Sequence, residues 1–393
     1  MNILFLANRF PYPPFRGDKL KIYNLTKRLS KKHTLYLLTF YEDRDELNYL
    51  QELKPFFKEI ELVYLPKWQS ILNGIPALLS RTPLQMAYFK SAKMKRMMKF
   101  VLEHYKIDVV HTQHLRMSQY TKDLNIPKIL DLPDAFSLYF KRRKETERPL
   151  INRLIDAIEI GRLAKAEGVI SKYDKTLVCS VEDKNYLEKL HKTNNIDILL
   201  NGVDLTTFDI KEGHDYTHNH TVLFTGNMDY APNVDGVQYF AKEMWPILSE
   251  KYPNTKFVIA GQRPVEAVKK LSSNRIEVTG FVPDIQEMYK QASVVIAPLR
   301  FGAGTQNKVL EAMAMGVPTV CTHIGFEGLQ IASGDGVIMA KEKEQFIAEV
   351  ASLLDSSEKR QHVGEKGLDV ARNRFSWDKI SNDLEDYFNE VTQ

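Results

Sequence analysis

Cysteine is scarce: the 393-residue chain has two, Cys179 and Cys321. Each closes an apolar run typical of a β-strand, so we expect buried, reduced thiols. Two cysteines exclude a disulfide framework, and their spacing does not fit a zinc site. We therefore expect a protein of a reducing compartment, the cytoplasm.

Long apolar runs are also missing. No uninterrupted run approaches the ~20 residues that a membrane-spanning helix needs. Residues 3–7 (ILFLA) already read as a short strand, not as a basic segment followed by a long apolar one, so we expect no leader. The expectation is a protein that is soluble or lies on a membrane surface.

Charge is divided unevenly along the chain. Residues 1–200 hold 35 of the 54 basic and 23 of the 50 acidic residues, a net charge of +12; the remaining 19 basic and 27 acidic residues give −8. Basic residues cluster at 90–106 and 141–144. A solvated surface would explain such clusters equally well. The functional interpretation is attraction to an anionic partner: phospholipid headgroups, a lipid pyrophosphate or a polyanion.

Short apolar runs alternate with amphipathic stretches twice along the chain. Seven runs in the first half are predicted strands: 3–7, 34–40, 60–65, 109–111, 129–132, 176–179 and 196–200. Six follow in the second half: 221–225, 256–260, 276–279, 294–297, 319–321 and 336–339. Runs that are apolar throughout are typical of parallel strands buried on both faces. The pattern predicts an α/β fold of two doubly wound, Rossmann-like domains facing a cleft.

The polar stretch 209–219 is the predicted linker. The domains are predicted over residues 1–208 and 217–375. Between the strands, residues 19–29 and 181–190 are predicted helices, the second with a capping box that begins at Ser180. In open α/β sheets ligands bind beyond the carboxyl ends of the strands, so the site is sought there.

Residues 300–311 are the strongest candidate for a ligand site. A strand ends at Pro298, a loop with Gly302 and Gly304 follows, and Thr305 is predicted to cap the next helix. Glycine lets the backbone approach a ligand closely, and the start of a helix presents free N–H groups to an anion. The loop therefore predicts an anion site.

Lys308 and Glu311 lie three residues apart, on the charged stripe of an otherwise apolar helix. The lysine can pair with a phosphate, and the glutamate can accept hydrogen bonds from two ribose hydroxyls. The alternative is a solvated Lys–Glu pair. The glycine loop before them and the apolar surroundings favour a nucleotide ligand.

Several motifs carry a resemblance to one enzyme family. They are PPFRGD (13–18), DVVH (108–111), NGVD (201–204), LEAMAMGVPTV (310–320), GFEGL (325–329) and FSW (375–377). Together, in this order, they resemble the retaining GT-B glycosyltransferases of family 4 over essentially the whole chain. FTGNMDYAPN (224–233) resembles a subgroup of sugar transferases from bacterial exopolysaccharide clusters.

The resemblance implies the transfer of a sugar, with retention, from a nucleotide-diphosphate sugar to a hydroxyl of a glycan, which we expect to be lipid-linked, in cell-surface polysaccharide biosynthesis. It also implies an acceptor-side first domain, a donor-binding second domain, and a C-terminal helix, 376–393, that packs back on the first domain. Glu311 would hold the ribose, and Lys308 would face the diphosphate and sugar. The other implied donor-binding residues are Gly17, Phe281, Val282, Gly302, Ala303, Gly304 and Thr305.

Two positions depart from the family pattern. Ala303 stands where a second glutamate is usual, eight residues before Glu311. Asn227 and Met228 stand where a basic residue is expected after the glycine of the first strand of the second domain. Arg263 is the candidate to replace that charge.

Candidate catalytic residues follow two predicted strands of the first half. His111 and His114 follow the fourth strand, and Asp131 and Asp134 the fifth. A base at such a strand end could orient or deprotonate an acceptor hydroxyl, although a loop side chain bonded to backbone explains each equally well. We favour His114 and Asp134, because the other two lie nearer the strands.

No carboxylate is evident as a covalent nucleophile, which fits a front-face transfer. The resemblance implies no cofactor and no metal. The expected partners are a nucleotide sugar, a glycan or lipid-linked acceptor and an anionic membrane surface, with no nucleic acid. The expected location is the cytoplasm, peripheral to the inner membrane face.

Three other functions are the alternatives. A nucleotide-sugar epimerase shares the fold but needs no large acceptor surface, so the basic first half argues against it. A non-catalytic nucleotide-sugar-binding partner of another transferase would explain Ala303. A dinucleotide-dependent oxidoreductase is disfavoured, because no G-x-G-x-x-G follows the first strand.

Overall fold

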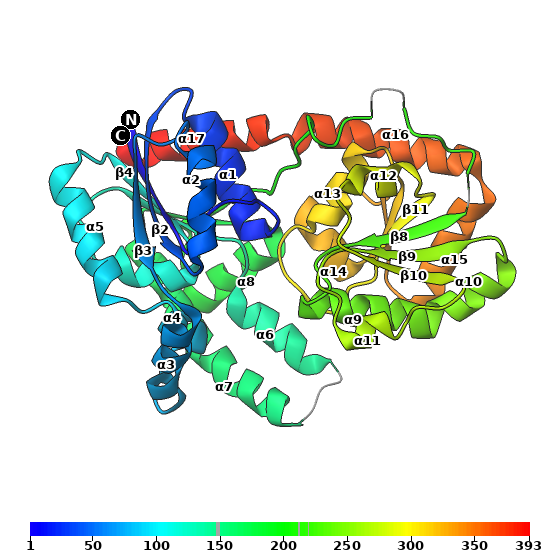
Figure 1. Cartoon of the computed structure of the whole chain (residues 1–393), viewed down its shortest axis with the longest axis horizontal. Coiled ribbons are helices and arrows are strands. Elements are labelled where there is room, and N and C mark those ends of the chain that lie inside the picture. Colours follow the sequence, from blue (N-terminus) through cyan, green and yellow to red (C-terminus); the bar gives the residue numbers. More distant parts are fainter. Residues whose placement is uncertain (147–149, 211–212, 219) are drawn as a thin grey trace. The chain divides into compact units, whose positions relative to one another are not determined.

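The computed structural model describes residues 1–146, 150–210, 213–218 and 220–393. They form two compact units, each with its own parallel sheet (Figure 1). The first unit combines Met1–Asn201 with Trp377–Gln393, and the second is Gly202–Ser376. The chain thus leaves the first unit once and returns to it with its last helix.

The first unit is built on a seven-stranded parallel sheet of order β3-β2-β1-β4-β5-β6-β7. Its strands are β1 (Asn2–Ala7), β2 (Thr34–Tyr41), β3 (Glu59–Tyr64), β4 (Val109–Gln113), β5 (Lys128–Leu132), β6 (Lys175–Val178) and β7 (Ile196–Ile198). The central strands are buried almost throughout, because helices cover both faces of the sheet. This burial is why β1 carries the continuous apolar run ILFLA instead of an alternating pattern.

Nine helices of the first unit lie in the described residues. They are α1 (Gly17–Leu29), α2 (Leu50–Leu53), α3 (Lys67–Leu78), α4 (Leu84–Tyr88), α5 (Ala92–His104), α6 (Phe136–Glu145), α7 (Leu150–Glu167), α8 (Val181–His191) and α17 (Trp377–Thr392), with 3-10 turns at Arg44–Tyr49, Leu115–Tyr120 and Gly168–Lys172. The Ser180 hydroxyl accepts a hydrogen bond from the Asp183 N–H and caps α8 as predicted. Helix α17 packs beside α1, and Trp377 and Phe388 are buried in the same core as Phe5.

The second unit is built on a six-stranded parallel sheet of order β10-β9-β8-β11-β12-β13. Its strands are β8 (Thr221–Thr225), β9 (Lys256–Ala260), β10 (Ile276–Gly280), β11 (Val294–Ala297), β12 (Thr319–Thr322) and β13 (Val337–Ala340). Its helices are α9 (Ala231–Tyr239), α10 (Trp245–Lys251), α11 (Glu266–Lys269), α12 (Ile285–Lys290), α13 (Asn307–Ala314), α14 (His323–Phe326), α15 (Lys343–Asp355) and α16 (Ser357–Arg374), with a π-helical segment at Phe240–Met244 and a 3-10 turn at Glu327–Leu329.

The predicted linker packs on the second unit where it is described. The Tyr216 hydroxyl donates to the Gly316 carbonyl at 2.9 Å, and Arg360 donates to the Tyr216 carbonyl at 2.6 Å. Lys211, Glu212 and Asn219 of the same stretch lie outside the described residues.

The strand order confirms the predicted class of two doubly wound α/β domains. In each sheet the winding reverses between two neighbouring strands, β1 and β4 in the first unit and β8 and β11 in the second. Ligands of such sheets bind beyond the carboxyl ends of the strands at this reversal. The loops that follow β1, β4, β8 and β11 are therefore where a site is expected. The loop after β11 contains four of the sequence-predicted residues, Gly302, Ala303, Gly304 and Thr305.

Candidate functional site

The loop after β11 has the backbone of a ligand cradle. Gly302 and Gly304 have φ angles of 152° and 68°, which residues with a Cβ rarely adopt. Behind the loop, a Cβ added to Gly328 would come within 2.6 Å of the Thr305 Cα, so only glycine fits there. Gly328 belongs to the GFEGL motif, and its role is to let this segment support the loop.

Thr305 does not cap α13, contrary to the sequence prediction. The N-cap position is Gln306, and it makes no side-chain capping bond. The Thr305 hydroxyl instead donates to the Gly328 carbonyl at 3.1 Å. Since the hydroxyl is used to fasten the loop, the first N–H groups of α13 lack a capping side chain and are available to a ligand.

Lys308 is a buried cation in the first turn of α13. Its side chain is 7% exposed, and its Nζ donates to Asn233 Oδ1 at 3.1 Å and to Gln306 Oε1 at 3.4 Å. The Nζ also lies 5.0 Å from the centre of the Phe224 ring. No carboxylate among the described residues comes within ion-pair distance of it. Burial consequently lowers the pKa of Lys308 to about 8.

Glu311 is held by a tyrosine. Its Oε2 accepts from the Tyr289 hydroxyl at 2.7 Å, and that hydroxyl is also 2.7 Å from the Thr225 Oγ1. Burial raises the pKa of Glu311, against the opposing effects of Tyr289 and Lys308. The alternative of a solvated Lys–Glu pair on a helix surface is wrong for Lys308, which is buried and bonded to amide oxygens.

The loop after β8 lies against the loop after β9. A Cβ on Gly261 would come within 1.7 Å of the Gly226 carbonyl oxygen, and one on Gly226 within 2.6 Å of the Asn233 amide. These contacts set the position of Asn233, the residue that receives Lys308. Arg263 lies in the same loop after β9. It has a φ of 58°, and its half-exposed guanidinium pairs with Asp229 at 3.2 Å.

The other predicted donor residues lie at loop ends. Phe281 is exposed directly after β10, while Val282 packs against the core that contains Tyr289. Ala303 lies within the β11 loop and is half-buried. Gly17, in the first unit, begins α1 and is exposed.

In the first unit, His114 follows β4 in a strained conformation. Its φ is 70°, its ring stacks on Phe136 at 5.9 Å, and its backbone N–H donates to the Asp131 carbonyl. Its Nδ1 has no hydrogen-bond partner in the described chain. Burial, together with Arg116, lowers the pKa of His114 to about 3. The imidazole is therefore neutral near pH 7, and its ring nitrogens can accept or donate a single hydrogen bond.

The pKa of Asp134 is shifted in the opposite direction. Burial, together with the nearby Asp183, raises the pKa of Asp134 to about 7. A carboxyl group that titrates near neutral pH is suited to accepting a proton and releasing it again. Arg116 lies near both groups, and burial lowers its own pKa to about 10.

His111 and Asp131 are fully buried, as befits a structural role. Asp131 Oδ1 accepts from Lys21 Nζ at 2.8 Å, and Asp131 Oδ2 lies 3.5 Å from His111 Nε2. Sequence reasoning missed Lys21. The available signal was a lysine on the apolar face of the predicted helix, next to Ile22 and Leu25.

Asp18 ties the loop after β1 to the neighbouring strand. Its carbonyl accepts from the Gln113 side chain at 2.7 Å, and its carboxylate from Arg9 at 3.0 Å. Burial would raise the pKa of Asp18, but Arg9 and His114 lower it below the usual range. The sequence analysis also missed Asn233 and Tyr289, although Asn233 lies in the FTGNMDYAPN motif.

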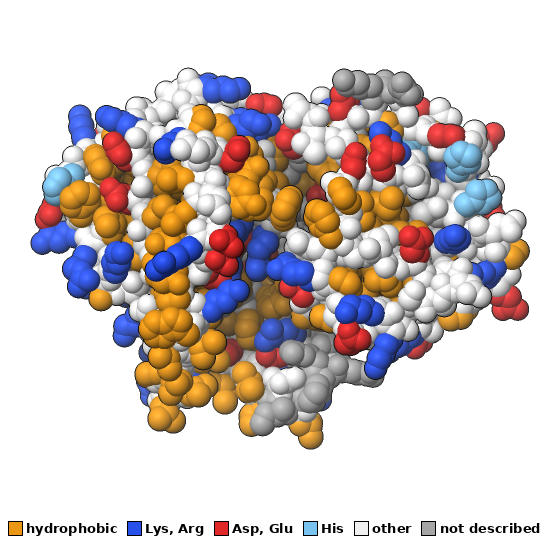
Figure 2. Space-filling model, in the orientation of Figure 1, with side chains coloured by type: hydrophobic (Ala, Val, Ile, Leu, Met, Phe, Trp, Pro, Cys, Tyr) orange, Lys and Arg blue, Asp and Glu red, His pale blue; other side chains and the backbone are white. Residues whose placement is uncertain are grey.

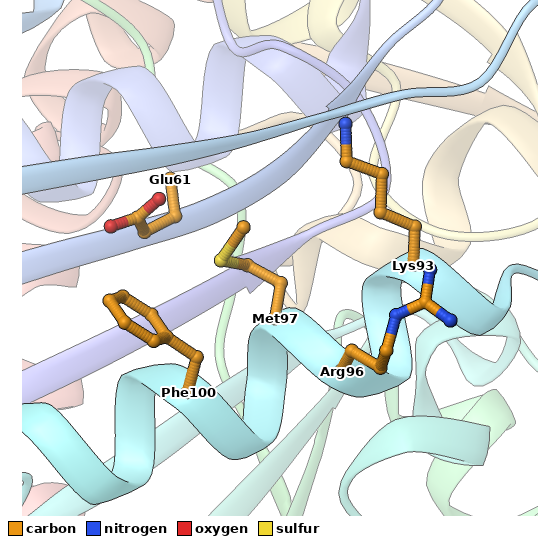
Figure 3. A pocket seen from close by; sticks show the side chains of 5 residues that line it. All are labelled: Glu61, Lys93, Arg96, Met97 and Phe100. Atoms are coloured by element: carbon orange, nitrogen blue, oxygen red, sulfur yellow. The ribbon is translucent and has the colours of Figure 1, made fainter.

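A separate hollow of about 450 Å³ lies elsewhere in the first unit (Figure 3). It is lined by Glu61 from β3 and by Lys93, Arg96, Met97 and Phe100 from α5. None of the predicted site residues lines it. In the described residues there is no cluster of metal-ligating side chains and no helix long and apolar enough to cross a membrane.

Part of the second unit is similar to a known protein family. Residues 219–356 match the family model of glycosyl transferases group 1. The whole chain is similar to an uncharacterized 44.6 kDa protein in the cps region of Klebsiella pneumoniae. The two are 23% identical over 406 residues, which covers 99% of this chain and 98% of that protein.

Solved structures share the fold over the full length. Sucrose-phosphate synthase from Thermosynechococcus elongatus superposes with a TM-score of 0.73 at 13% identity, covering 100% of this chain and 99% of that one. HepE from Anabaena, solved in complex with UDP and glucose, gives 0.70 at 14% identity, covering 99% of each chain. These matches show that the fold is GT-B.

Proposed function

We propose that this protein is a group 1 glycosyltransferase, which transfers a sugar, with retention, from a nucleotide-diphosphate sugar to a hydroxyl of a lipid-linked glycan in cell-surface polysaccharide biosynthesis. The observation that carries the proposal is the buried Lys308, whose ammonium contacts amide oxygens and has no carboxylate within ion-pair distance in the described chain; Glu311, one turn further along α13, acts on it only from a greater distance. A buried cation without a counter-ion is costly, and a diphosphate would supply the missing charge.

The donor would bind to the second unit. The glycine loop and the uncapped start of α13 offer N–H groups to the diphosphate, and Lys308 offers its ammonium. Glu311, fixed by Tyr289 and partly exposed, would accept from the ribose hydroxyls. Phe281 and Val282 would lie at the base, and Gly17 and Arg263 near the phosphates or sugar. HepE, which has the same fold, was solved with UDP.

The acceptor would meet the first unit. In a front-face transfer the bond from the sugar to the diphosphate breaks and the bond to the acceptor oxygen forms on the same face. Asp134 would take the proton of the acceptor hydroxyl, and neutral His114 would position the sugar by a hydrogen bond. The cps-region relative supports a polysaccharide as the product.

We place the enzyme in the cytoplasm at the inner membrane face. The first 200 residues carry a net charge of +12, which attracts anionic headgroups and the pyrophosphate of a lipid carrier. Ala303 favours a second candidate, a partner that binds a nucleotide sugar without turning it over. Turnover of the donor separates the two.

Nucleotide binding tests the donor site. We expect one nucleoside diphosphate among UDP, ADP and GDP, at 100 times its Kd, to stabilise the chain by about 2.7 kcal/mol in thermal unfolding. Glu311→Ala should lose most of this stabilisation, whereas Glu287→Ala, an exposed glutamate on α12, should keep it. If no nucleotide stabilises the wild type, or if both variants respond like it, the site assignment is wrong.

The pH profile of donor turnover tests the catalytic role of Asp134. Because its pKa is about 7, kcat/KM for the corresponding nucleotide sugar should fall as the pH drops below 7 and Asp134 becomes protonated. Asp134→Asn should lower kcat about 100-fold or more and remove this acidic limb.

The matched control is Glu167→Gln. Burial raises the pKa of Glu167 to about 7 as well, but its carboxylate is occupied by Ser137. The control should keep the acidic limb. A limb that disappears in Glu167→Gln and persists in Asp134→Asn would contradict the assignment, and a wild type that binds but never turns over donor would favour the binding-only function.

A further inference from the structure

Helix α3 exposes large apolar side chains to solvent. Of its twelve described residues, only Ser70 and Ala77 are buried, so it is attached along a narrow face. The exposed apolar side chains on it and just after it are Trp68, Ile71, Leu72, Ile75, Leu78 and Leu79. Figure 2 shows apolar side chains gathered over the position of α3, at the lower left. Exposed apolar patches of this size mark interaction surfaces.

A second helix extends this surface. Arg162 of α7 donates to the Leu78 carbonyl at 3.1 Å, and Glu159 accepts from the Leu84 N–H at 2.9 Å, so α7 lies beside the end of α3. The preceding turns of α7 expose Leu150, Leu154, Ile155 and Ile158. We refer to these four residues and the six on α3 as the α3/α7 apolar surface.

Positive charge borders the surface. Residues 62–102 contain seven lysines and arginines and no acidic residue. Lys67 begins α3, exposed Arg81 follows Leu79 by two residues, and the Lys90 carbonyl accepts from Asn73 on α3 at 2.9 Å. An apolar centre with basic neighbours is complementary to a lipid surface with anionic headgroups.

We propose that the α3/α7 apolar surface inserts into the interfacial layer of an anionic membrane while Lys67, Arg81 and Lys90 contact the headgroups. This inference rests on the proposed membrane location and adds which elements enter the lipid. With twelve residues, α3 is about 18 Å long, which suits a helix that lies in the interface. A second copy is the poorer occupant, because an isologous contact would oppose its basic residues to those of its partner.

Tryptophan fluorescence reports the insertion directly. The chain has three tryptophans: Trp68 is 64% exposed, whereas Trp245 and Trp377 are 4% and 1% exposed. Vesicles of phosphatidylcholine and phosphatidylglycerol should shift the Trp68 emission to shorter wavelength. Vesicles with brominated acyl chains should quench it, and Trp68→Phe should abolish both changes. Pure phosphatidylcholine should bind the protein more weakly.

Matched variants separate insertion from other modes of binding. Leu72→Ser/Leu79→Ser should weaken vesicle binding about tenfold or more, because two leucines no longer enter the lipid. Ile247→Ser, which changes an apolar residue of the second unit that is as exposed as Leu72, should bind like the wild type. Nucleotide-induced thermal stabilisation should be unchanged in both, which shows that they are folded and tests the donor site independently.

Three outcomes would overturn the inference. Vesicle binding without quenching of Trp68, released fully by salt, would mean docking by charge alone. A Trp68 shift that grows with protein concentration without lipid, together with a dimer in sedimentation velocity that Leu72→Ser/Leu79→Ser disrupts, would mean that a second copy covers the surface. No binding to anionic vesicles at all would reject the membrane as occupant.

Discussion

The two units each bury a lysine close to the reversal of their sheet, and the two lysines differ in one respect. Lys21 of the first unit is bonded to the carboxylate of Asp131 at 2.8 Å. Lys308 of the second unit meets the amide oxygens of Asn233 and Gln306. Burial lowers the pKa of both lysines, but Asp131 more than compensates for Lys21, whose pKa is raised, whereas that of Lys308 falls to about 8.

This difference distinguishes a lysine that stabilises the fold from a lysine that is a candidate for binding a ligand. A buried charge whose counter-ion is part of the chain holds elements together, here α1 to β5. A buried charge without one is a cost that the fold tolerates, and a ligand of opposite charge relieves it. Burial of a titratable group therefore indicates a ligand site only after its partners have been identified.

Removing the paired lysine should have the largest effect. Lys21→Met leaves Asp131 as an uncompensated buried charge, so we expect a loss of about 3–5 kcal/mol in the free energy of unfolding, measured by urea denaturation. Adding Asp131→Asn removes the orphaned charge and should restore part of the loss. If the double variant is as unstable as the single one, the ion pair is not the cause.

Removing the unpaired lysine should affect binding and spare stability. Lys308→Met should weaken nucleoside diphosphate binding by about 1.5–3 kcal/mol, the range for a hydrogen bond to a charged group, as measured by calorimetry. Its unfolding free energy at pH 7 should be equal to or higher than that of the wild type, since a buried cation is gone. A variant that is destabilised as strongly as Lys21→Met would remove the distinction between the two lysines.

The smallest expected effect is the pH dependence of diphosphate binding, which further distinguishes Lys308 from Lys21. Free Lys308 loses its proton above about pH 8, so diphosphate affinity should fall by up to about tenfold per pH unit there. The unfolded chain keeps that proton up to the ordinary lysine pKa, so the apo protein should gain stability between pH 8 and about 10.5. The affinity of Lys308→Met should stay constant over this window; a parallel fall would assign the titration to another group.

The strands were predictable because they are buried on both faces. A parallel strand that is buried on both faces, such as β1 or β11, is apolar at nearly every position, so a short apolar run between polar turns identifies it directly. The class of fold follows from the alternation of these strands with helices. The start of α13 was predicted less well. The choice between Thr305 and Gln306 as N-cap depends on Gly328, which is far away in sequence.

The proposed donor site is visible in the sequence only in its local part. Glycines, Lys308 and Glu311 lie within ten residues of one another, so the pattern is visible in one stretch of sequence. Asn233 and Tyr289 come from other elements and reach the site through tertiary packing, which no local pattern encodes. Lys21 left only the local signal of a lysine on an apolar helix face, because its partner Asp131 is 110 residues away.

The return of the chain to the first unit has a consequence for biosynthesis. Trp377, Ile380, Leu384 and Phe388 of α17 complete the core behind β1, although β1 is made first and α17 last. The second unit is one continuous segment of the chain and can fold as it leaves the ribosome. The core of the first unit stays incomplete until α17 has been made. A stop codon before α17 should thus spare the unit just completed and leave the oldest part of the chain exposed to chaperones and proteases.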